Sequence, residues 1–203
     1  MFSAGLDIPA LLQLNRGQMA EVWRNLYETL GALACSSIPI CAAVTGHAPA
    51  GGTVLAIFCD WRIGAQGPFK IGLSEVQVGL PLPPIILHCL RRLVGSHQAE
   101  RLAVRGLLMD SEEAKRIRLL DEVVPPENVL GRAIQWSGEM LAIPPNAMAY
   151  TRQQARADLK AIFERDLSSE IAEMGQAWWQ PETQAMLRAV VERLSKKKAT
   201  VSS

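Results

Sequence analysis

The chain has 203 residues, of which 49% are hydrophobic and 20% are charged, and its formal net charge at pH 7 is +1. This balance is typical of a globular protein with enough apolar material for a core, built as one domain or as one domain with an extension. The near-neutral charge argues against a nucleic-acid partner, and no apolar run is long enough to span a membrane. The four cysteines are scattered and form no C-x-x-C pair, so the pattern favours a reducing compartment over a metal centre or a disulfide framework.

The first residues have the pattern of a loop that leads into a helix. Phe2 is apolar, Gly5 marks a turn, and Asp7 is a candidate helix cap before Ile8. A chain seldom opens on such a loop with no element in front of it. The loop is therefore either a frayed terminus or a sign that part of the natural domain lies outside this sequence. Residues 16–34 then form a predicted helix, because apolar residues recur there every three or four positions.

The stretch from residue 41 to residue 55 is the most informative part of the chain. An apolar, strand-like run ends at Gly46, and the pair Gly51 and Gly52 opens a second apolar run with helical character. A strand that enters a helix in this way leaves unpaired N–H groups at the helix start, where the helix dipole favours negative charge. The stretch predicts a site for an anion, or for an oxygen that becomes one during a reaction. The alternative is that the glycines serve only a tight turn or close packing.

Glu75 is a carboxylate in an otherwise apolar stretch that is bounded by Gly72 and Gly79. Burial there would raise its pKa and make it a usable proton acceptor. The alternative is a surface glutamate that, together with Ser74, begins a helix.

The other predicted elements follow from hydrophobic periodicity and from Gly and Pro positions. Strands are predicted at 60–63 and 69–71, and we expect the first of them to run parallel to the strand before Gly46. A further extended piece is predicted at 121–124. Helices are predicted at 85–93, at 96–105 with Ser96 as the cap, from residue 111, and at 127–142, 146–160, 161–179 and 182–197.

Three motifs, in this order, resemble those of the crotonase superfamily, the enoyl-CoA hydratase/isomerases. They are FSAGLD at residues 2–7, GHAPAGG at residues 46–52 followed by CDWRI, and IGLSEVQVG at residues 71–79. Within that superfamily they are most like the monofunctional Δ3,Δ2-enoyl-CoA isomerases of the mitochondrial type. The resemblance implies an α/β fold, a crotonase-type spiral of ββα units with a C-terminal helical region.

The same resemblance implies a division of the chain. Residues 1–125 are expected to form a partial crotonase core, and residues 126–203 a helical oligomerisation region that supports a homotrimer or hexamer. Members of the family have a section before the first motif, so we expect the first strands of the fold to be missing here. Any targeting peptide would precede Met1, and the compartment would be the mitochondrial matrix in a eukaryote or the cytoplasm in a bacterium.

By motif position, the backbone N–H groups of Leu6 and Gly51 correspond to the oxyanion hole of the family, which holds the thioester oxygen of an acyl-CoA. The backbone of Ala4 and Gly5 lies where the family holds the adenine end of CoA. His47 lies in the loop beside Gly51, where we interpret it as a residue that fills the loop.

The family's hydratases use two glutamates on either side of a water. Here one of those positions is Val54, which can neither activate nor orient water, and the other is Glu75. This is the isomerase pattern, in which Glu75 alone moves a proton of a 3-enoyl-CoA in fatty acid β-oxidation and no cofactor is needed beyond the CoA of the substrate. The alternatives are hydration, thioester hydrolysis, and a non-catalytic protein that binds acyl-CoA or only assembles.

Overall fold

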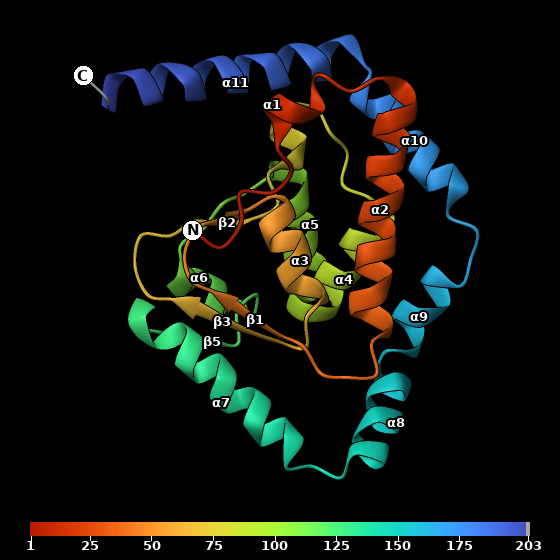
Figure 1. The fold of residues 1–203 in the computed structure, drawn as a ribbon, viewed down its shortest axis with the longest axis vertical. Coiled ribbons are helices and arrows are strands. Elements are labelled where there is room, and N and C mark those ends of the chain that lie inside the picture. Colours follow the sequence, from red (N-terminus) through yellow and green to blue (C-terminus); the bar gives the residue numbers. More distant parts are fainter. Residues whose placement is uncertain (202–203) are drawn as a thin grey trace.

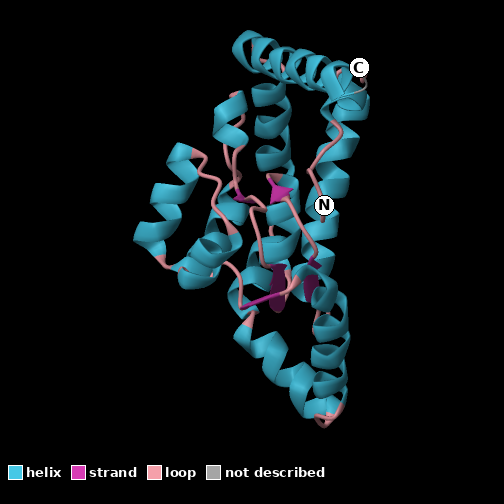
Figure 2. Cartoon of the chain, turned by 90° about the vertical axis from the view of Figure 1, so that its left-hand side faces the viewer, coloured by secondary structure: helices cyan, strands magenta, loops and turns pink. Residues whose placement is uncertain are grey.

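The computed structural model describes the backbone of residues 1–201 and the side chains of residues 1–196. Helices surround a small number of short strands, as Figure 1 and the rotated view in Figure 2 show. The strands are β1 (Cys41–Val44), β2 (Ala48–Pro49), β3 (Trp61–Ala65), β4 (Ile71–Gly72) and β5 (Glu122–Val124). The helices before residue 120 are α1 (Ile8–Leu11), α2 (Arg16–Cys35), α3 (Gly51–Phe58), α4 (Pro84–Val94), α5 (Ser96–Arg105) and α6 (Ser111–Arg116), with the 3-10 helix η1 (Glu75–Val78) between β4 and α4. The helices after it are the 3-10 helix η2 (Pro126–Asn128), α7 (Val129–Leu141), α8 (Pro145–Ala155), α9 (Ala157–Phe163), α10 (Ser168–Trp178) and α11 (Pro181–Val201).

The described strands form two small parallel sheets. One has the order β1-β3-β5, and the other pairs β2 with β4. Cys41 lies opposite Trp61 in the first sheet, so the prediction that these two strands run parallel is confirmed. Parallel neighbours need a crossover, and α3 is the helix in the connection between β1 and β3. The glycine-rich stretch therefore lies at the start of a crossover helix.

Helix α2 confirms the helix predicted at residues 16–34. Its first turn is closed by a capping box in which Asn15 and Gln18 accept each other's backbone N–H groups. Its apolar face is buried at Met19, Trp23 and Leu30. Helix α10 packs against it, and Trp23 meets Trp178 edge to face with 6.2 Å between the ring centroids.

Two predictions about the later helices were wrong in detail. Ser96 is the first residue of α5 rather than its cap, because Gly95 takes the N-cap position with φ +79°. The helices predicted at 146–160 and 161–179 are in fact α8, α9 and α10. The helical periodicity of the sequence continues through Arg156, but the backbone leaves the helical region at this residue, where φ is −113°.

Helix α7 covers one face of the first sheet. Its buried Val129 and Ala133 pack against Ile63 of β3, and Trp136 stacks on Trp61 with 6.2 Å between ring centroids. The division of the chain near residue 126 stays a prediction. Among the residues that the structure describes, no helix is both long and apolar enough to cross a bilayer.

Candidate active site

The candidate site begins where β2 and β4 end. Ala48 lies opposite Ile71 in this parallel pair, and the chain leaves β2 into α3 and leaves β4 toward η1. The N–H of Ala50 donates to the carbonyl of Gly72 at 2.9 Å. Because the carboxyl ends of parallel strands meet at one edge, the start of α3 and the segment that carries Glu75 leave from the same edge.

Thr53 fixes these two strands to α3. Its buried hydroxyl donates to the carbonyl of Ala48 at 2.5 Å and accepts the N–H of Gly72 at 2.8 Å. One side chain therefore links the crossover helix to both strands. The role of Thr53 was not predicted from the sequence, where its only signal is a threonine directly after a Gly-Gly pair.

The first loop lies across the N-terminus of α3, as Figure 1 shows for the segment before α1. The N–H groups of Phe2 and Ser3 donate to the carbonyl of His47 at 3.0 and 3.3 Å. A Cβ added at Gly5 would lie 2.9 Å from the nitrogen of Gly51, and Gly5 has φ +86°. Glycine is therefore required at both positions by the close approach of the two backbones.

The two N–H groups predicted to form an oxyanion hole are neighbours in space. A Cβ built at Gly51 would lie 3.5 Å from the nitrogen of Leu6. Within the described residues, neither the Leu6 nor the Gly51 N–H donates a hydrogen bond. Gly51 is the first residue of α3, whose dipole adds partial positive charge at this point. The pair can hold an oxygen that carries or develops negative charge. Ala4, predicted to bind CoA, is exposed beside them.

The residue before Gly51 has an unusual backbone. Ala50 has φ +49° and ψ −120°, a region that residues with a Cβ rarely adopt. The hydrogen bond from Ala50 to Gly72 and the bond from the Val54 N–H to the carbonyl of Ala50 hold it there. Strain of this kind concentrates at functional sites, and here it sets the direction in which α3 begins.

Glu75 is the first residue of η1 and is partly buried. Its Oε2 atom is buried without a hydrogen-bond partner among the described residues. Burial raises the pKa of this carboxyl to about 7, against a smaller lowering by its own backbone N–H. Such a group can both take and return a proton near neutral pH.

Val54 lies on α3 and is 3% exposed, so its side chain belongs to the apolar core. His47 has a structural role in the loop: its Nδ1 accepts the N–H of Lys70 at 3.1 Å, and its ring meets Phe69 edge to face. In the described part of the chain, no group of three His, Cys, Asp or Glu side chains is arranged to hold a metal ion.

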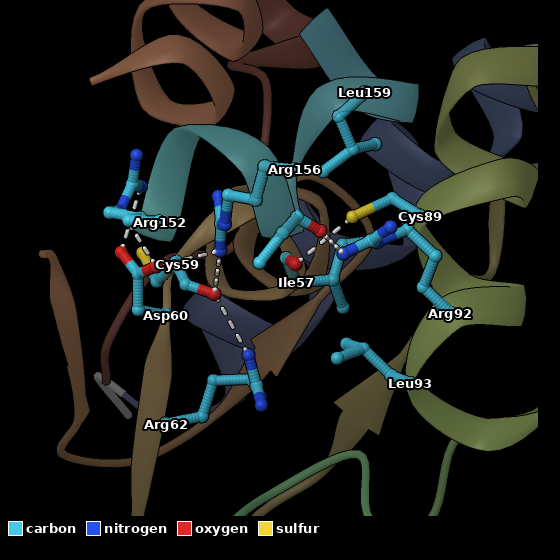
Figure 3. Close-up of a pocket in the computed structure, with 11 residues that line it drawn as sticks. Ile57, Cys59, Asp60, Arg62, Cys89, Arg92, Leu93, Arg152, Arg156 and Leu159 are labelled. Carbon is cyan, nitrogen blue, oxygen red and sulfur yellow. Dashed lines mark hydrogen bonds and ion pairs between the residues drawn. The ribbon is translucent and has the colours of Figure 1, made fainter. Parts of the chain in front are cut away.

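A cavity of about 240 Å³ lies at the other end of α3 (Figure 3). The guanidinium of Arg156 donates to the carbonyls of Phe58 and Cys59 at 2.9 and 3.0 Å, which satisfies the last carbonyls of the helix. Arg152 forms an ion pair with Asp60 at 2.9 Å. These contacts dock α8 and α9 on the core, and no local pattern in the sequence predicts them.

Comparison with known proteins places this geometry in a family. The sequence profile described as enoyl-CoA hydratase/isomerase matches residues 1–198. The chain is 31% identical over 199 residues to the mitochondrial enoyl-CoA delta isomerase 1 of Mus musculus. The matched region covers 98% of this chain and 69% of the relative. The corresponding Homo sapiens protein is 30% identical, with 98% and 66% covered. A probable enoyl-CoA hydratase, echA17 of Mycobacterium avium, is 34% identical over 172 residues, with 85% and 65% covered.

Among solved structures, the human mitochondrial delta3-delta2-enoyl-CoA isomerase superposes with a TM-score of 0.92 at 30% identity, over 98% of this chain and 77% of that one. The predicted crotonase-type α/β fold is therefore confirmed. The chain spans about two thirds of the length of the curated relatives it matches. The chain therefore belongs to the enoyl-CoA hydratase/isomerase family.

Proposed function

We propose that this chain is an enoyl-CoA isomerase that moves the double bond of a 3-enoyl-CoA to the 2-trans position, with Glu75 as its single acid/base group. The observation that carries the proposal is a lone, partly buried carboxylate with a pKa of about 7, in a site whose second acidic position is the buried Val54. A group that must both accept and return a proton works best with a pKa near the working pH. The names of the mitochondrial delta isomerases among the similar proteins support the same reaction.

The proposed reaction begins at C2, whose protons are acidified by the thioester. The carboxylate of Glu75 takes one of them, and the electron pair of the broken C–H bond passes into a dienolate that carries negative charge on the thioester oxygen. The N–H groups of Leu6 and Gly51 stabilise that oxygen, and each such donor contributes about 3 kcal/mol to the transition state. Glu75 then returns the proton to C4 and regains its carboxylate form. The reaction changes no oxidation state and consumes no water, so it needs no cofactor beyond the CoA of the substrate.

Hydration is the second candidate, because the similar proteins include probable enoyl-CoA hydratases. A water that adds to C3 must be activated and oriented by polar groups. Val54 is 3% exposed and apolar, so it supplies neither function at the second acidic position. Thioester hydrolysis and acyl-CoA binding without turnover are further alternatives that the same experiment separates.

The experiment offers 3-enoyl-CoA and 2-enoyl-CoA separately to the wild type and to Glu75→Gln. Glutamine keeps the shape of the side chain but cannot accept the proton. Because general-base catalysis contributes about 10²–10⁴-fold, we expect isomerisation to fall by about that factor in Glu75→Gln. Hydration of 2-enoyl-CoA that survives the substitution would contradict the single-base isomerase. Binding of both thioesters without turnover by the wild type would support the non-catalytic alternative.

The remaining parts of the proposal concern binding and assembly. We expect the backbone of Ala4 and Gly5 to contact the adenine end of CoA, and the chain to form a homotrimer or hexamer through residues 126–203. Its compartment would be the mitochondrial matrix in a eukaryote or the cytoplasm in a bacterium, in line with the mitochondrial and bacterial relatives. Light scattering of the purified chain, with and without CoA ester, measures the molar mass of the assembly and so the number of subunits.

A further inference from the structure

The segment that carries Glu75 is a single short turn. The 3-10 helix η1 has four residues and few internal hydrogen bonds, so its position depends on what its ends contact. The N–H of Leu80 donates to the carbonyl of Glu75 at 3.1 Å, and the N–H of Gly79 donates to that of Val76 at 3.2 Å. A displacement of Gly79 therefore reaches Glu75 through one turn of backbone.

Helix α11, from the far end of the chain, holds Gly79. Thr183 near the start of this helix is 2% exposed, and its Oγ1 donates to the carbonyl of Gly79 at 2.9 Å. A Cβ added at Gly79 would lie 3.0 Å from that Oγ1 and 3.2 Å from the Cα of Thr183. Gly79 also has φ +77°, so only glycine fits this contact without strain.

Helix α5 holds the middle of the same turn. The Nε2 of Gln77 donates to the carbonyl of Gly106 at 2.8 Å, directly after the last residue of α5. A Cβ added at Gly106 would lie 2.9 Å from side-chain atoms of both Gln77 and Val76. The turn is thus fixed between the end of α5 and the start of α11.

Hydrogen bonding gives the carboxyl of Glu75 little orientation apart from its own backbone. Its Oε2 has no hydrogen-bond partner among the described residues, and the hydrogen bond that acts on the carboxyl comes from its own backbone N–H. The backbone of η1 therefore sets the point from which this side chain starts and the N–H group that its carboxyl contacts.

We propose that Thr183 is a positioning residue for Glu75, and that its bond to the carbonyl of Gly79 holds η1 where the carboxyl meets the substrate. The inference rests on the proposed function of Glu75 as the acid/base group. It makes the start of α11, more than a hundred residues away in sequence, a part of what supports the active site.

The test compares Thr183→Val, which removes the hydroxyl, with Thr183→Ser, which keeps it. Thr29→Val is the matched control, because the Thr29 hydroxyl also donates to a backbone carbonyl, that of Asn25 at 2.7 Å, on an exposed part of α2. Two quantities are measured. One is kcat/KM for 3-enoyl-CoA as a function of pH, and the other is the titration midpoint of Glu75, followed by carbon-13 NMR without substrate and assigned with Glu75→Gln.

We expect Thr183→Val to lower kcat/KM by about 10-fold, because small misplacements of a reacting group reduce rates steeply. Its Glu75 midpoint should fall by about 1 pH unit, because a looser turn admits water to the carboxyl. Thr183→Ser and Thr29→Val should keep both values. If Thr183→Val does not fold, the same two quantities are compared between Thr183→Ala and Thr183→Ser, at a temperature below the melting temperature of Thr183→Ala.

An unchanged rate, pH profile and midpoint in the folded hydroxyl-less variant would overturn the positioning role. The proposed function fails separately. If the wild type does not isomerise 3-enoyl-CoA, the function is wrong, while the NMR midpoint still decides whether Thr183 sets the environment of Glu75.

Discussion

Gly52→Ala is expected to disable the proposed oxyanion site by adding one methyl group. A Cβ at Gly52 would lie 2.4 Å from the carbonyl oxygen of Ser3, well inside the 3.0 Å below which real Cβ contacts are essentially not seen. The oxygen belongs to the backbone, and the N–H groups of Phe2 and Ser3 are both bonded to the carbonyl of His47, so no side-chain rotation relieves the clash. The loop that carries Leu6 must move away from α3 by roughly half an ångström or more.

The expected loss of activity in Gly52→Ala follows from the role proposed for the Leu6 N–H. Loss of one oxyanion donor lowers kcat by about 10²–10³-fold, and misplacement of a catalytic group by about 1 Å costs about 100-fold. We therefore expect Gly52→Ala to lower kcat by about 100-fold with a smaller change in KM, because the donor acts most strongly on the transition state. The helix itself should tolerate the change, since alanine is the better helix former.

The assay follows the absorbance of the conjugated 2-enoyl thioester as it forms from 3-enoyl-CoA, together with the melting temperature. Gly131→Ala is the control, because a Cβ at this position of α7 meets nothing within 4 Å. It should keep kcat and stabilise the fold by about 0.5–1 kcal/mol. A Gly52→Ala protein with wild-type kcat and a wild-type melting temperature would refute the reasoning, because the first loop would then tolerate displacement.

Two further predictions concern stability. Burial raises the folded-state pKa of Glu75 from 4.5 to about 7, so the folded protein binds this proton more tightly than the unfolded chain does. The free energy of unfolding of the wild type should therefore fall relative to that of Glu75→Gln as pH rises from 4.5 to 7, by about 2 kcal/mol in chemical denaturation. Asp60→Asn should lower the free energy of unfolding by about 3 kcal/mol, because it leaves the buried Arg152 and the neighbouring Arg156 without their carboxylate. Glu164→Gln, which breaks an exposed ion pair, should change it by less than about 0.5 kcal/mol, and equal effects of the two variants would contradict the docking role of Asp60.

The elements that could be predicted from the sequence are those whose signals are local. Helix α2 has a continuous apolar face behind its capping residues, and α5 lies between Gly95 and Gly106. The break at Arg156 has no such signal. Its guanidinium bonds to carbonyls of residues 58 and 59, nearly a hundred residues away in the chain, and a contact over that distance leaves no local pattern.

The failure at Ser96 has a different origin. A serine caps a helix only from an extended backbone one residue before the first turn. Gly95, with φ +79° and ψ 160°, both ends α4 and begins α5, so no residue is left between them for a side-chain cap. Two helices joined by one residue look the same in a sequence pattern as two helices joined by a capped turn.

The glycines of the candidate site could be foreseen because close backbone contact leaves a direct mark on the sequence. At Gly5, Gly51 and Gly52 an added Cβ would come within 3.0 Å of the opposing backbone, so other residues are excluded. Ala50 and Thr183 carry no such mark. Ala50 adopts a backbone that its residue type does not suggest, and Thr183 donates a single hydrogen bond to a distant carbonyl.

This difference explains why the sequence predicts the groups of the site better than their arrangement. The presence of Glu75 and the two N–H groups is a property of residue types at fixed positions in three motifs. Their direction depends on a strained Ala50 ahead of one N–H group and on a turn held by α5 and α11 behind the carboxyl. In the proposed reaction one carboxyl takes a proton from C2 and returns it to C4, so it must reach two carbons of a substrate whose oxygen is fixed. We therefore expect the contacts that set direction to affect the rate as much as the residues that the motifs name.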